Sequence, residues 1–391
     1  MSTATQAPGG MRYMQGISVP GSSIDPTTFF ANTRRRTSTE QTAAWAGFGA
    51  QDTCEIRKSG ILSGIIVKFK GSLVIGDATT ASTYRWPYDI LNALRFTANG
   101  QSNLINCSGL KLKARELMAS AVLQDSGIAQ TIGGAAKTQG TLSTRSELWG
   151  VGSGGAVAAG TYPVSLVWYV PVCEDEVDLA GAIYAATSST DLNVVCIWEQ
   201  VGSLFTGYTV TPTLSGTLTF QSIKYAIPVV SGAIVLPDLS VFHSMIQSRV
   251  TGQLSNGDNE FRITGQGAGK TLLRLFYQVW NNAAPSVIPL VMNDTNFGRQ
   301  SWRYGDNEMP DEYLDGQVLR EVNERTYGGD FGGVWGFGSH EFAKSNALRD
   351  SIDEGETSEL RLECNITSAP TLVSAAFEYV REEIFAAGAG A

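Results

Sequence analysis

Residues 265–271, GQGAGKT, come closest in this sequence to a group that could do chemistry, the phosphate-binding loop of an ATPase. Such a loop needs a glycine five positions before the glycine of its GK pair, because that turn wraps the phosphates; Thr264 occupies the position here. The residues that follow, LLRLFYQVW, alternate like a strand instead of opening a helix whose N-terminus could hold phosphate. We predict a glycine-rich loop between two strands, and a packaging ATPase that depends on Lys270 is the least favoured function.

A second glycine motif, GxGxxG, occurs in WGVGSGG at Gly150, Gly152 and Gly155. A dinucleotide site requires this motif between a strand and a helix of a βαβ unit. The sequence that follows, AVAAGTYPVSLVWYVPV, becomes a strand. We therefore predict a flexible turn here and no bound cofactor.

Four acidic residues crowd the loop that follows Pro171, and such a cluster could bind calcium or supply an acid–base pair. They lack the regular spacing of a calcium loop. Because acids in a loop at the end of a strand are usually solvated, we predict a solvated loop, with a weak metal site as the alternative. The four are Glu174, Asp175, Glu176 and Asp178.

Histidine and cysteine offer little material for catalysis. His243 and His340 are the only histidines and lie far apart, which disfavours a histidine triad or metal cluster. No two cysteines lie close enough for a zinc knuckle or a redox pair. We predict buried, inert thiols in a reducing cytoplasm, and neither an enzyme nor a bound metal or cofactor. The cysteines are Cys54, Cys107, Cys173, Cys196 and Cys364.

The composition indicates which elements must position these residues. Of 391 residues only 17% are charged, 43 are glycine, and the apolar fraction is 43%. Chains poor in charge and rich in glycine usually form many short strands joined by tight turns. No apolar run is long enough for a membrane span, the first residues lack the pattern of a secretion signal, and a net charge of −9 disfavours direct binding of nucleic acid. We predict a soluble, mainly all-β protein.

Two series of alternating apolar residues predict antiparallel sandwiches with one face of each strand buried. Each series includes one segment with helical features, 110–123 in the first and 309–324 in the second, the latter opened by a proline and an acid. The division falls near Ser231 and Gly232, and the same succession of elements on both sides predicts a structural repeat. The clearest alternating runs are 61–75, 162–170, 192–198 and 214–223, then 261–263, 273–279, 360–366 and 372–380.

The N-terminal residues differ from the rest because they contain the only triple-arginine run, Arg34, Arg35 and Arg36. Residues 1–40 hold four arginines against two acids, a net +2 in an acidic chain, and aromatic residues flank the run. A basic segment with aromatics can lie on an anionic lipid surface. The other interpretation is a solvated arm that ties neighbouring subunits together, and the sequence favours neither.

Four stretches resemble the major capsid proteins of tailless, membrane-containing phages of the tectivirus kind. Residues 164–200 show a strand ending in a WVP-like step, an acidic loop and a DL-G-A turn, and 234–243 resemble the I-LP-DLS run that opens the second barrel. Residues 86–96 and the closing strand with its E-Y pair, 372–384, are also similar, and all four occur in the family's order. The family-like positions are Trp168, Pro171, Asp178, Gly181, Pro237, Asp238, Glu378 and Tyr379.

The resemblance implies a double jelly roll, two eight-stranded β-sandwiches side by side with short inserted helices. On this interpretation residues 1–50 are a basic arm near the membrane, 51–231 the first jelly roll, and 232–391 the second with a C-terminal tail. Three chains are then expected to form a pseudo-hexagonal homotrimeric capsomer that tiles an icosahedral shell over an internal membrane. The expected partners are neighbouring capsomers, penton or minor capsid proteins and, through the arm, membrane lipids, with synthesis and assembly in the host cytoplasm.

The alternative function is that of a β-sandwich spike protein that binds a glycan or a receptor. Sugar-binding platforms use exposed aromatic rings, and Trp149, Trp302 and Trp335 are the candidates for exposure. Trp168 and Trp198 lie in alternating strands, where we expect them in the core. Glycan binding would favour this alternative, whereas a stable trimer would favour the capsomer.

Overall fold

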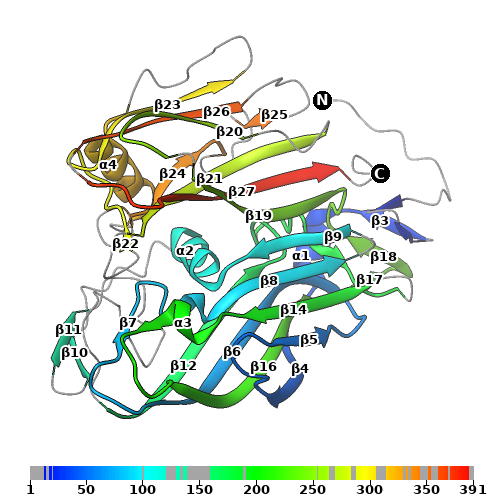
Figure 1. Ribbon diagram of the computed structural model, residues 1–391. Coiled ribbons are helices and arrows are strands. Elements are labelled where there is room, and N and C mark those ends of the chain that lie inside the picture. The colour runs from blue at the N-terminus through cyan, green and yellow to red at the C-terminus, as the bar shows by residue number, and fades with distance from the viewer. Residues whose placement is uncertain are drawn as a thin grey trace.

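The computed structural model describes most of the chain, and the statements below concern that part. It consists mainly of strands, arranged as two β-sandwiches that lie one above the other in Figure 1. None of the helices described is long and apolar enough to cross a membrane. The described residues are 13–14, 17–19, 21–98, 101–119, 129–132, 135–138, 159–187, 191–252, 254–263, 269–282, 288–304, 314–328, 332, 336–343, 351–353, 360–368 and 370–386.

The first sandwich has two layers of antiparallel strands. In order of their pairing, the strands of one layer are Gly160–Pro171 (β12), Ile61–Ile75 (β6), Thr213–Tyr225 (β16) and Arg35–Ala44 (β4). Those of the other layer are, again in order of pairing, Gln101–Cys107 (β9), Leu91–Ala98 (β8), Leu192–Trp198 (β14) and Gln51–Glu55 (β5). The interior strands of each layer therefore share backbone hydrogen bonds with a neighbour on both sides.

Alternation along these strands buries one face of each layer, as a sandwich requires. In β14 the side chains of Leu192, Val194, Cys196 and Trp198 are buried, and those between them are exposed or half-buried. The facing layer supplies Trp168, whose ring centroid lies 6.2 Å from that of Trp198. The core positions predicted for both tryptophans and the burial of Cys196 are confirmed.

The second sandwich also has two layers, around a core of its own. One comprises Gly338–Glu341 (β24), Lys270–Asn281 (β21), Ala376–Ala386 (β27) and Val241–Thr251 (β19), with Ile288–Pro289 (β22) and Ile352–Asp353 (β25) also paired to β21. The other comprises Phe297–Tyr304 (β23), Leu360–Ile366 (β26) and Gly257–Arg262 (β20).

The two sandwiches share one topology. The layer β12-β6-β16-β4 corresponds strand for strand, in chain order, to β24-β21-β27-β19, and β8-β14-β5 corresponds to β23-β26-β20. In both, the last strand of the unit inserts beside the first, which is the arrangement of a jelly roll. The predicted repeat and the double jelly roll are confirmed.

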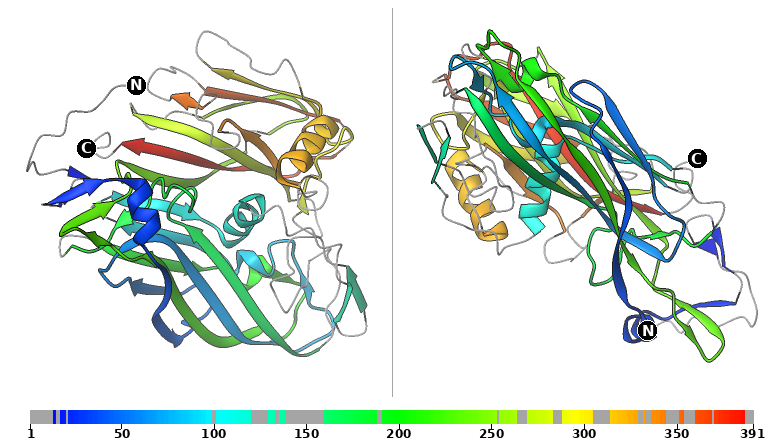
Figure 2. Two further views of the ribbon diagram at one scale, coloured as in Figure 1. Left: turned by 180° about the vertical axis from the view of Figure 1, so that it is seen from behind. Right: turned by 90° about the horizontal axis from the view of Figure 1, so that it is seen from below.

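A short parallel pairing joins the two units into one continuous sheet. Ile105 and Asn106 of β9 pair with Met245 and Ile246 of β19, so the sheet runs β22-β21-β27-β19-β9-β8-β14-β5 across both sandwiches. Figure 2 shows the same neighbourhood from behind and from below. The two units therefore share backbone hydrogen bonds as well as side-chain contacts.

The first long helix lies where the sequence predicts it. α2 spans Gly109–Ala119, within one residue of the start of the predicted segment 110–123. The carboxylate of Asp89 accepts the N–H of Leu110 at 3.0 Å and so satisfies one of the free donors at the helix start. The last predicted residues, 120–123, lie outside the described residues.

The second long helix begins later than predicted. α4 spans Gly316–Tyr327, so the predicted segment 309–324 is wrong for residues 314 and 315, which are not helical, and its residues 309–313 lie outside the described residues. Its first turn begins beside Asp294, whose carboxylate accepts the N–H of Gln317 at 2.8 Å, and this tertiary contact takes the place of a local start signal. The helix ends at Gly328, which has the left-handed φ of 74° that favours glycine.

The prediction that residues 1–50 form a separate arm is wrong for residues 35–44. They are β4, which pairs along its length with β16 in the first sandwich. The buried carboxylate of Glu40 fastens this strand by accepting from Arg57 Nε at 3.0 Å and Lys224 Nζ at 2.9 Å. Burial alone would raise the pKa of Glu40, but hydrogen bonds from Ser222, Lys224 and Arg57 lower it to about 2.

The remaining elements are short and lie at the ends of the sandwiches. Ser22–Ile24 (β3) pairs in parallel with Ala233–Leu236 (β18), which forms a hairpin with Val229–Val230 (β17). Ser231 and Gly232, where we place the division, have the positive φ values of 51° and 83° in this hairpin turn. The others are Tyr13–Met14 (β1), Ile17–Ser18 (β2), Pro26–Asn32 (α1), Ala81–Ser82 (β7), Tyr88–Ile90 (η1), Ala129–Ile132 (β10), Ala135–Thr138 (β11), Ile183–Tyr184 (β13), Val201–Leu204 (α3) and Phe205–Thr206 (β15).

Candidate functional site: the charged seam between the sandwiches

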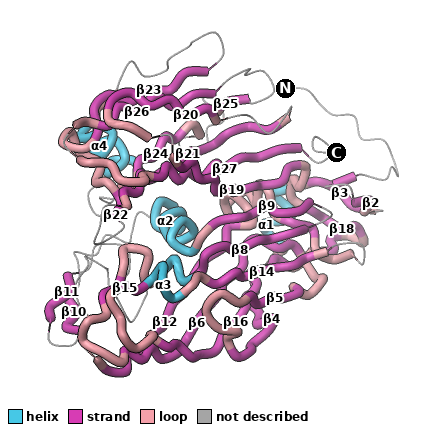
Figure 3. Tube along the Cα trace, viewed as in Figure 1, coloured by secondary structure: helices cyan, strands magenta, loops and turns pink. Residues whose placement is uncertain are grey.

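Helix α2 lies between the two sandwiches (Figure 3). Its Leu110 and Leu112 belong to the core of the first sandwich. Lys111 and Arg115 are four residues apart, hence on one face of the helix, and their buried side chains reach the second sandwich. We call the charged groups that meet here the seam: Arg85, Asp89, Lys111, Arg115, His243, Arg274, Glu378 and Glu382.

Glu382 of β27 is the first centre of the seam and is fully buried. Its carboxylate accepts from Arg115 Nε at 2.7 Å, Arg274 Nη1 at 2.5 Å and lies 3.0 Å from His243 Nε2. Burial alone would raise the pKa of this carboxyl, but the two guanidinium charges and the histidine outweigh burial and hold the pKa well below its usual range. Glu382 is therefore an anion that joins α2 of the first sandwich to two strands of the second.

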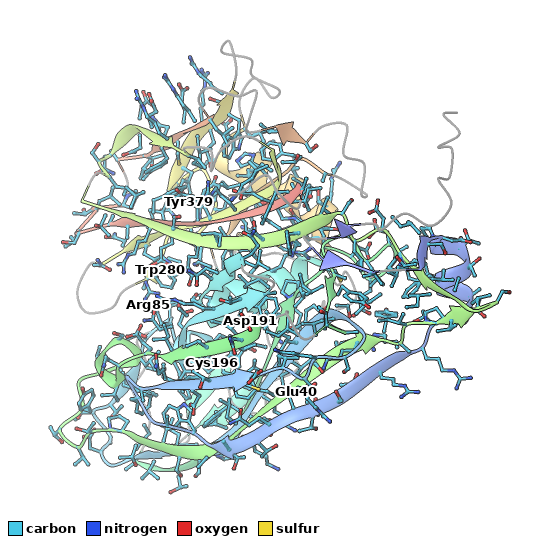
Figure 4. All side chains as sticks on the ribbon, turned by 90° about the vertical axis from the view of Figure 1, so that its right-hand side faces the viewer. Glu40, Arg85, Asp191, Cys196, Trp280 and Tyr379 are labelled. Carbon is cyan, nitrogen blue, oxygen red and sulfur yellow. The ribbon has the colours of Figure 1, made fainter. Side chains whose placement is uncertain are left out.

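Glu378, four residues earlier on the same strand, is the second centre. It lies 2.8 Å from Arg85 Nη2 and 3.3 Å from Lys111 Nζ. Burial would raise its pKa, but the charges of Lys111 and Arg85 lower it to about 2. The Arg85 guanidinium also stacks on Trp280 at 4.4 Å, and Figure 4 shows both residues between Cys196 of the first sandwich and Tyr379 of the second.

The seam extends to helix α4 of the second sandwich. Arg274 donates to Glu341 of β24 as well as to Glu382, and the Tyr327 hydroxyl donates to Glu341 at 2.9 Å. The Asn323 amide holds the same helix by donating to the Ser339 carbonyl and accepting the Ser339 N–H. One network of charges thus orients the inserted helix of each sandwich.

This arrangement fixes geometry and has no group placed for catalysis. Each buried acid is shared by several cations, so removal of the acid leaves those cations without compensation inside the protein. Such a loss costs about 3–5 kcal/mol in proteins. The seam thus makes the relative orientation of the two sandwiches rigid.

Several of the family-like positions lie at the seam or next to it. Glu378 is one of its centres, and the Pro171 carbonyl lies 3.0 Å from His243 Nδ1. Gly181 has a φ of 85°, and a Cβ there would lie 2.4 Å from the Cβ of His243, so the backbone approach requires glycine. The DL-G-A turn of the sequence motif is therefore packed directly against the seam.

The other family-like positions have local roles. Trp168 and Tyr379 are buried in the first and second cores respectively. The Asp178 and Asp238 carboxylates accept the N–H groups of Ala180 and Ser240, at 2.8 and 2.9 Å, and so order their turns. Pro237, between β18 and Leu239, is buried.

The arginine run and the acidic loop, which the sequence treats as separate features, contact each other. Arg35 Nε lies 2.9 Å from Glu176, and Arg115 Nη2 lies 3.5 Å from Glu174. The prediction that the loop is merely solvated is wrong for these two acids, because both pair with arginines and the side chain of Glu174 is largely buried. Burial raises the pKa of Glu174, assisted by Glu382.

Residues of the motifs that suggested other chemistry have structural roles where they are described. Lys270 is the first residue of β21, with Nζ 3.8 Å from Glu383, and the strand expected after the glycine-rich loop is confirmed. Residues 264–268 and the GxGxxG motif lie outside the described residues. In the described part of the chain no three His, Cys, Asp or Glu residues are placed to hold a metal ion. His340 is buried, and burial lowers its pKa to about 3.

The tryptophans provide no exposed platform in the described residues. Trp302, predicted as a candidate for exposure, is 2% exposed because it packs in the second core against Phe342 and His340. That prediction is wrong. Trp149 and Trp335 lie outside the described residues.

Sequence reasoning missed Arg85, Arg115, Arg274 and Glu382 as parts of a common site. The available signal is a conflict between pattern and charge. Bases occupy LKLKAREL and acids occupy FEYVREEI, both segments whose spacing predicts burial. A buried charge requires a partner of opposite sign, so each segment predicts a partner without identifying it.

Comparison with known proteins agrees with this geometry. Residues 22–215 match the family model described as P3 major capsid protein N-terminal. No curated protein sequence matches the chain. Among solved structures, a chain from Sulfolobus Turreted Icosahedral Virus matches with a TM-score of 0.62 at 12% identity, covering 89% of this chain and 90% of that chain.

Two further structures show the same fold. The PBCV-1 virus capsid matches with a TM-score of 0.55 at 10% identity, covering 90% of this chain and 95% of that chain. The Faustovirus major capsid protein matches with a TM-score of 0.53 at 9% identity, covering 98% of this chain and 91% of that chain. At such identities these likenesses establish the fold alone.

The fold and the family match together define a class, the structural subunits of viral shells, in which binding to neighbouring subunits replaces catalysis. Within that class, the chain belongs to the P3-like double jelly-roll major capsid proteins. It is a component of the virion capsid and not an enzyme. The resemblance inferred from the sequence is confirmed.

Proposed function

We propose that three copies of this chain form a pseudo-hexagonal capsomer that tiles an icosahedral shell over an internal membrane. The observation that carries the proposal is the pair of topologically equivalent sandwiches joined side by side in one sheet. Three chains then place six similar sandwiches around a three-fold axis, and the outline approaches a hexagon. A hexagonal tile can meet six neighbours with similar edges.

The rigidity of the seam supports this function. A shell accumulates many weak contacts, and these add up only when every subunit presents its edges at the same angle. The continuous sheet and the buried acids Glu378 and Glu382 fix that angle between the sandwiches. We therefore treat the seam as the internal frame of the tile.

Solution mass tests the capsomer directly. Light scattering on a sizing column should give a species of three times 41.8 kDa that persists on dilution. Negative-stain images of the same fraction should show hexagonal outlines. A monomer at micromolar concentration would contradict the proposal.

The N-terminal end of the first sandwich is the part we propose to lie near the membrane. Arg34 and Arg36 are exposed, whereas Arg35 is paired with Glu176. The hairpin that follows β16 exposes Val229, and the backbone of Ala226 beside it donates to the Arg34 carbonyl, so the basic and apolar groups share one end of the molecule. Each exposed basic residue near an anionic surface contributes about 1 kcal/mol.

Co-sedimentation with anionic vesicles tests this placement. The double variant Arg34→Ala/Arg36→Ala should bind more weakly than the unaltered protein, while Lys68→Ala/Lys70→Ala, which removes two exposed cations from the side of the sandwich, should not. Equal binding by all three proteins would contradict a role for the arginines. The glycan-binding alternative lacks an exposed tryptophan among the described residues, and nothing else in that part favours it.

A further inference from the structure

The layer β20-β26-β23 of the second sandwich carries an ordered charge pattern on its outward face. In Figure 1 this layer lies on the side away from the first sandwich. Glu260 is directly opposite Glu363, while Arg262 is directly opposite Arg361, and Arg361 is directly opposite Arg303. Like charges therefore face each other across neighbouring strands in two adjacent rows.

We name these rows by their residues. The acidic row comprises Glu260 and Glu363, with Asp258 two positions further along β20, and the basic row comprises Arg262, Arg303 and Arg361. Glu260 and Arg262 are two positions apart on β20, so the rows are separated by about 7 Å. The face thus changes from negative to positive over one short step along the strands.

Such an arrangement is unfavourable for the isolated layer. Like charges directly opposite on neighbouring strands destabilise a sheet. The rows are connected by ion pairs: Arg262 Nε lies 3.1 Å from Glu260, Arg361 Nη1 lies 3.5 Å from Glu260, and Arg303 Nε lies 2.9 Å from Glu363. Exposed pairs of this kind contribute about 0–1 kcal/mol each, and the repulsion between like charges across the strands offsets part of that gain. The sorting of the charges by row therefore contributes little to the folding of one chain.

The shape of the face follows the same division. Asp258, Glu260 and Glu363, together with Arg299, line a hollow of about 410 Å³ at the acidic row. Beside it, Arg262 of the basic row has a side chain that is 63% exposed. The acidic side is concave and the basic side presents a long cationic side chain.

We propose that this face binds the same face of a second copy of the chain. A two-fold axis that lies in the interface, parallel to the rows and midway between them, places the acidic row of each copy on the basic row of the other. Each hollow then receives the arginines of the partner copy. This inference rests on the proposed function, because it requires copies of the chain that assemble into a shell. It assigns the contact to two chains of neighbouring capsomers.

Charge reversal provides the test. The variant Glu260→Arg/Glu363→Arg makes the acidic row basic, and Arg262→Glu/Arg361→Glu reverses two of the three charges of the basic row, so that its net charge becomes negative. At low salt, sedimentation velocity should show reversible association of unaltered capsomers that weakens as salt is added. Each variant alone should lose about tenfold or more of this association, and an equimolar mixture of the two should regain it, because every row then meets its opposite.

A matched control and two further readouts separate this contact from other effects. Glu55→Arg/Asp191→Arg reverses two exposed acids of the first sandwich and should leave association unchanged. Capsomer mass at high salt reports on the trimer independently, and denaturant unfolding shows that each variant is folded. Unimpaired association of either variant of the rows, or a mixture of folded variants that stays unassociated, overturns the proposal. An unaltered protein without salt-sensitive association overturns it too, whereas a monomer at high salt that dimerises at low salt would contradict only the trimer.

Discussion

The layers β12-β6-β16-β4 and β24-β21-β27-β19 occupy equivalent places in their sandwiches but have different surroundings. The outward face of the first is exposed at Lys68, Lys70 and Thr217. The outward face of the second is covered by α2, and its Glu378 and Glu382 are buried at the seam. The same strand order therefore carries surface residues in one unit and an internal ion network in the other, and the neighbour decides which.

The difference has a physical basis. Water solvates a charge on the first layer whether or not a partner is present, so such positions tolerate many residue types. A charge on the second layer is desolvated and depends on its partners. Mutations at equivalent positions should therefore differ strongly in their effect.

The largest effect is expected at Glu382. Replacement by alanine leaves Arg115 and Arg274 buried without their shared anion and should reduce the free energy of unfolding by about 3–5 kcal/mol. Denaturant titration followed by tryptophan fluorescence measures this. A loss below 1 kcal/mol would mean that water enters the seam and would break the contrast between the layers.

Acid should weaken the second sandwich first through His340 and then through the buried carboxylates, of which Glu378 is the clearest case. The pKa of His340 falls from 6.5 to about 3 on folding, so only the unfolded chain gains its proton as pH drops below 6.5, and stability declines. Glu378 has a pKa of about 2 instead of 4.5, so its contribution is present above pH 4.5 and is lost as pH falls toward 2. Protonation of Glu378 should lower the free energy of unfolding by about 3 kcal/mol.

Unfolding free energies measured across this pH range provide the check. The variant His340→Gln should flatten the curve between pH 6.5 and 4.5 and leave the steeper fall below it. An unaltered slope in the upper range would show that His340 is accessible to protons in the folded protein.

An intermediate effect is expected from Arg85→Lys. Lysine keeps the charge but cannot bridge Asp89 and Glu378 while stacking on Trp280, as the planar guanidinium does. We expect a loss of about 2 kcal/mol, the scale of one charge-assisted hydrogen bond. Thermal unfolding of Arg85→Lys measures this loss, with Lys111→Arg as a second charge-conserving variant for comparison. Equal stability of Arg85→Lys and the unaltered protein would contradict the role of the planar guanidinium.

The smallest effect is expected at Lys70 on the solvent-facing layer. Lys70→Ala should change the free energy of unfolding by less than about 0.5 kcal/mol, since its side chain is exposed. Measured in the same titration as Glu382→Ala, it gives the baseline of the comparison. A loss approaching that of Glu382→Ala would indicate that this face is also covered, for example by another copy of the chain.

Part of the fold could be predicted from the sequence, and β27 shows where prediction stops. Its period of two identifies a strand, and Phe377 and Tyr379 identify a core face. The same period places Glu378 and Glu382 on the opposite face, where nothing local identifies the helix from the other unit that covers them. The predicted start of α4 was wrong for a similar reason, since Asp294 supplies the N-terminal contact from a distant loop.

The sequence by itself determined the strands, their division into two similar series and the absence of a familiar catalytic arrangement, because these depend on local periodicity and spacing. It also carried the resemblance to the capsid family. Only the tertiary structure decided that β4 belongs to the first sandwich, that Arg35 meets Glu176, and that the buried acids of β27 meet the bases of α2. Burial and charge pairing are contacts between residues far apart in the chain, and a single sequence records each partner without recording which partners meet.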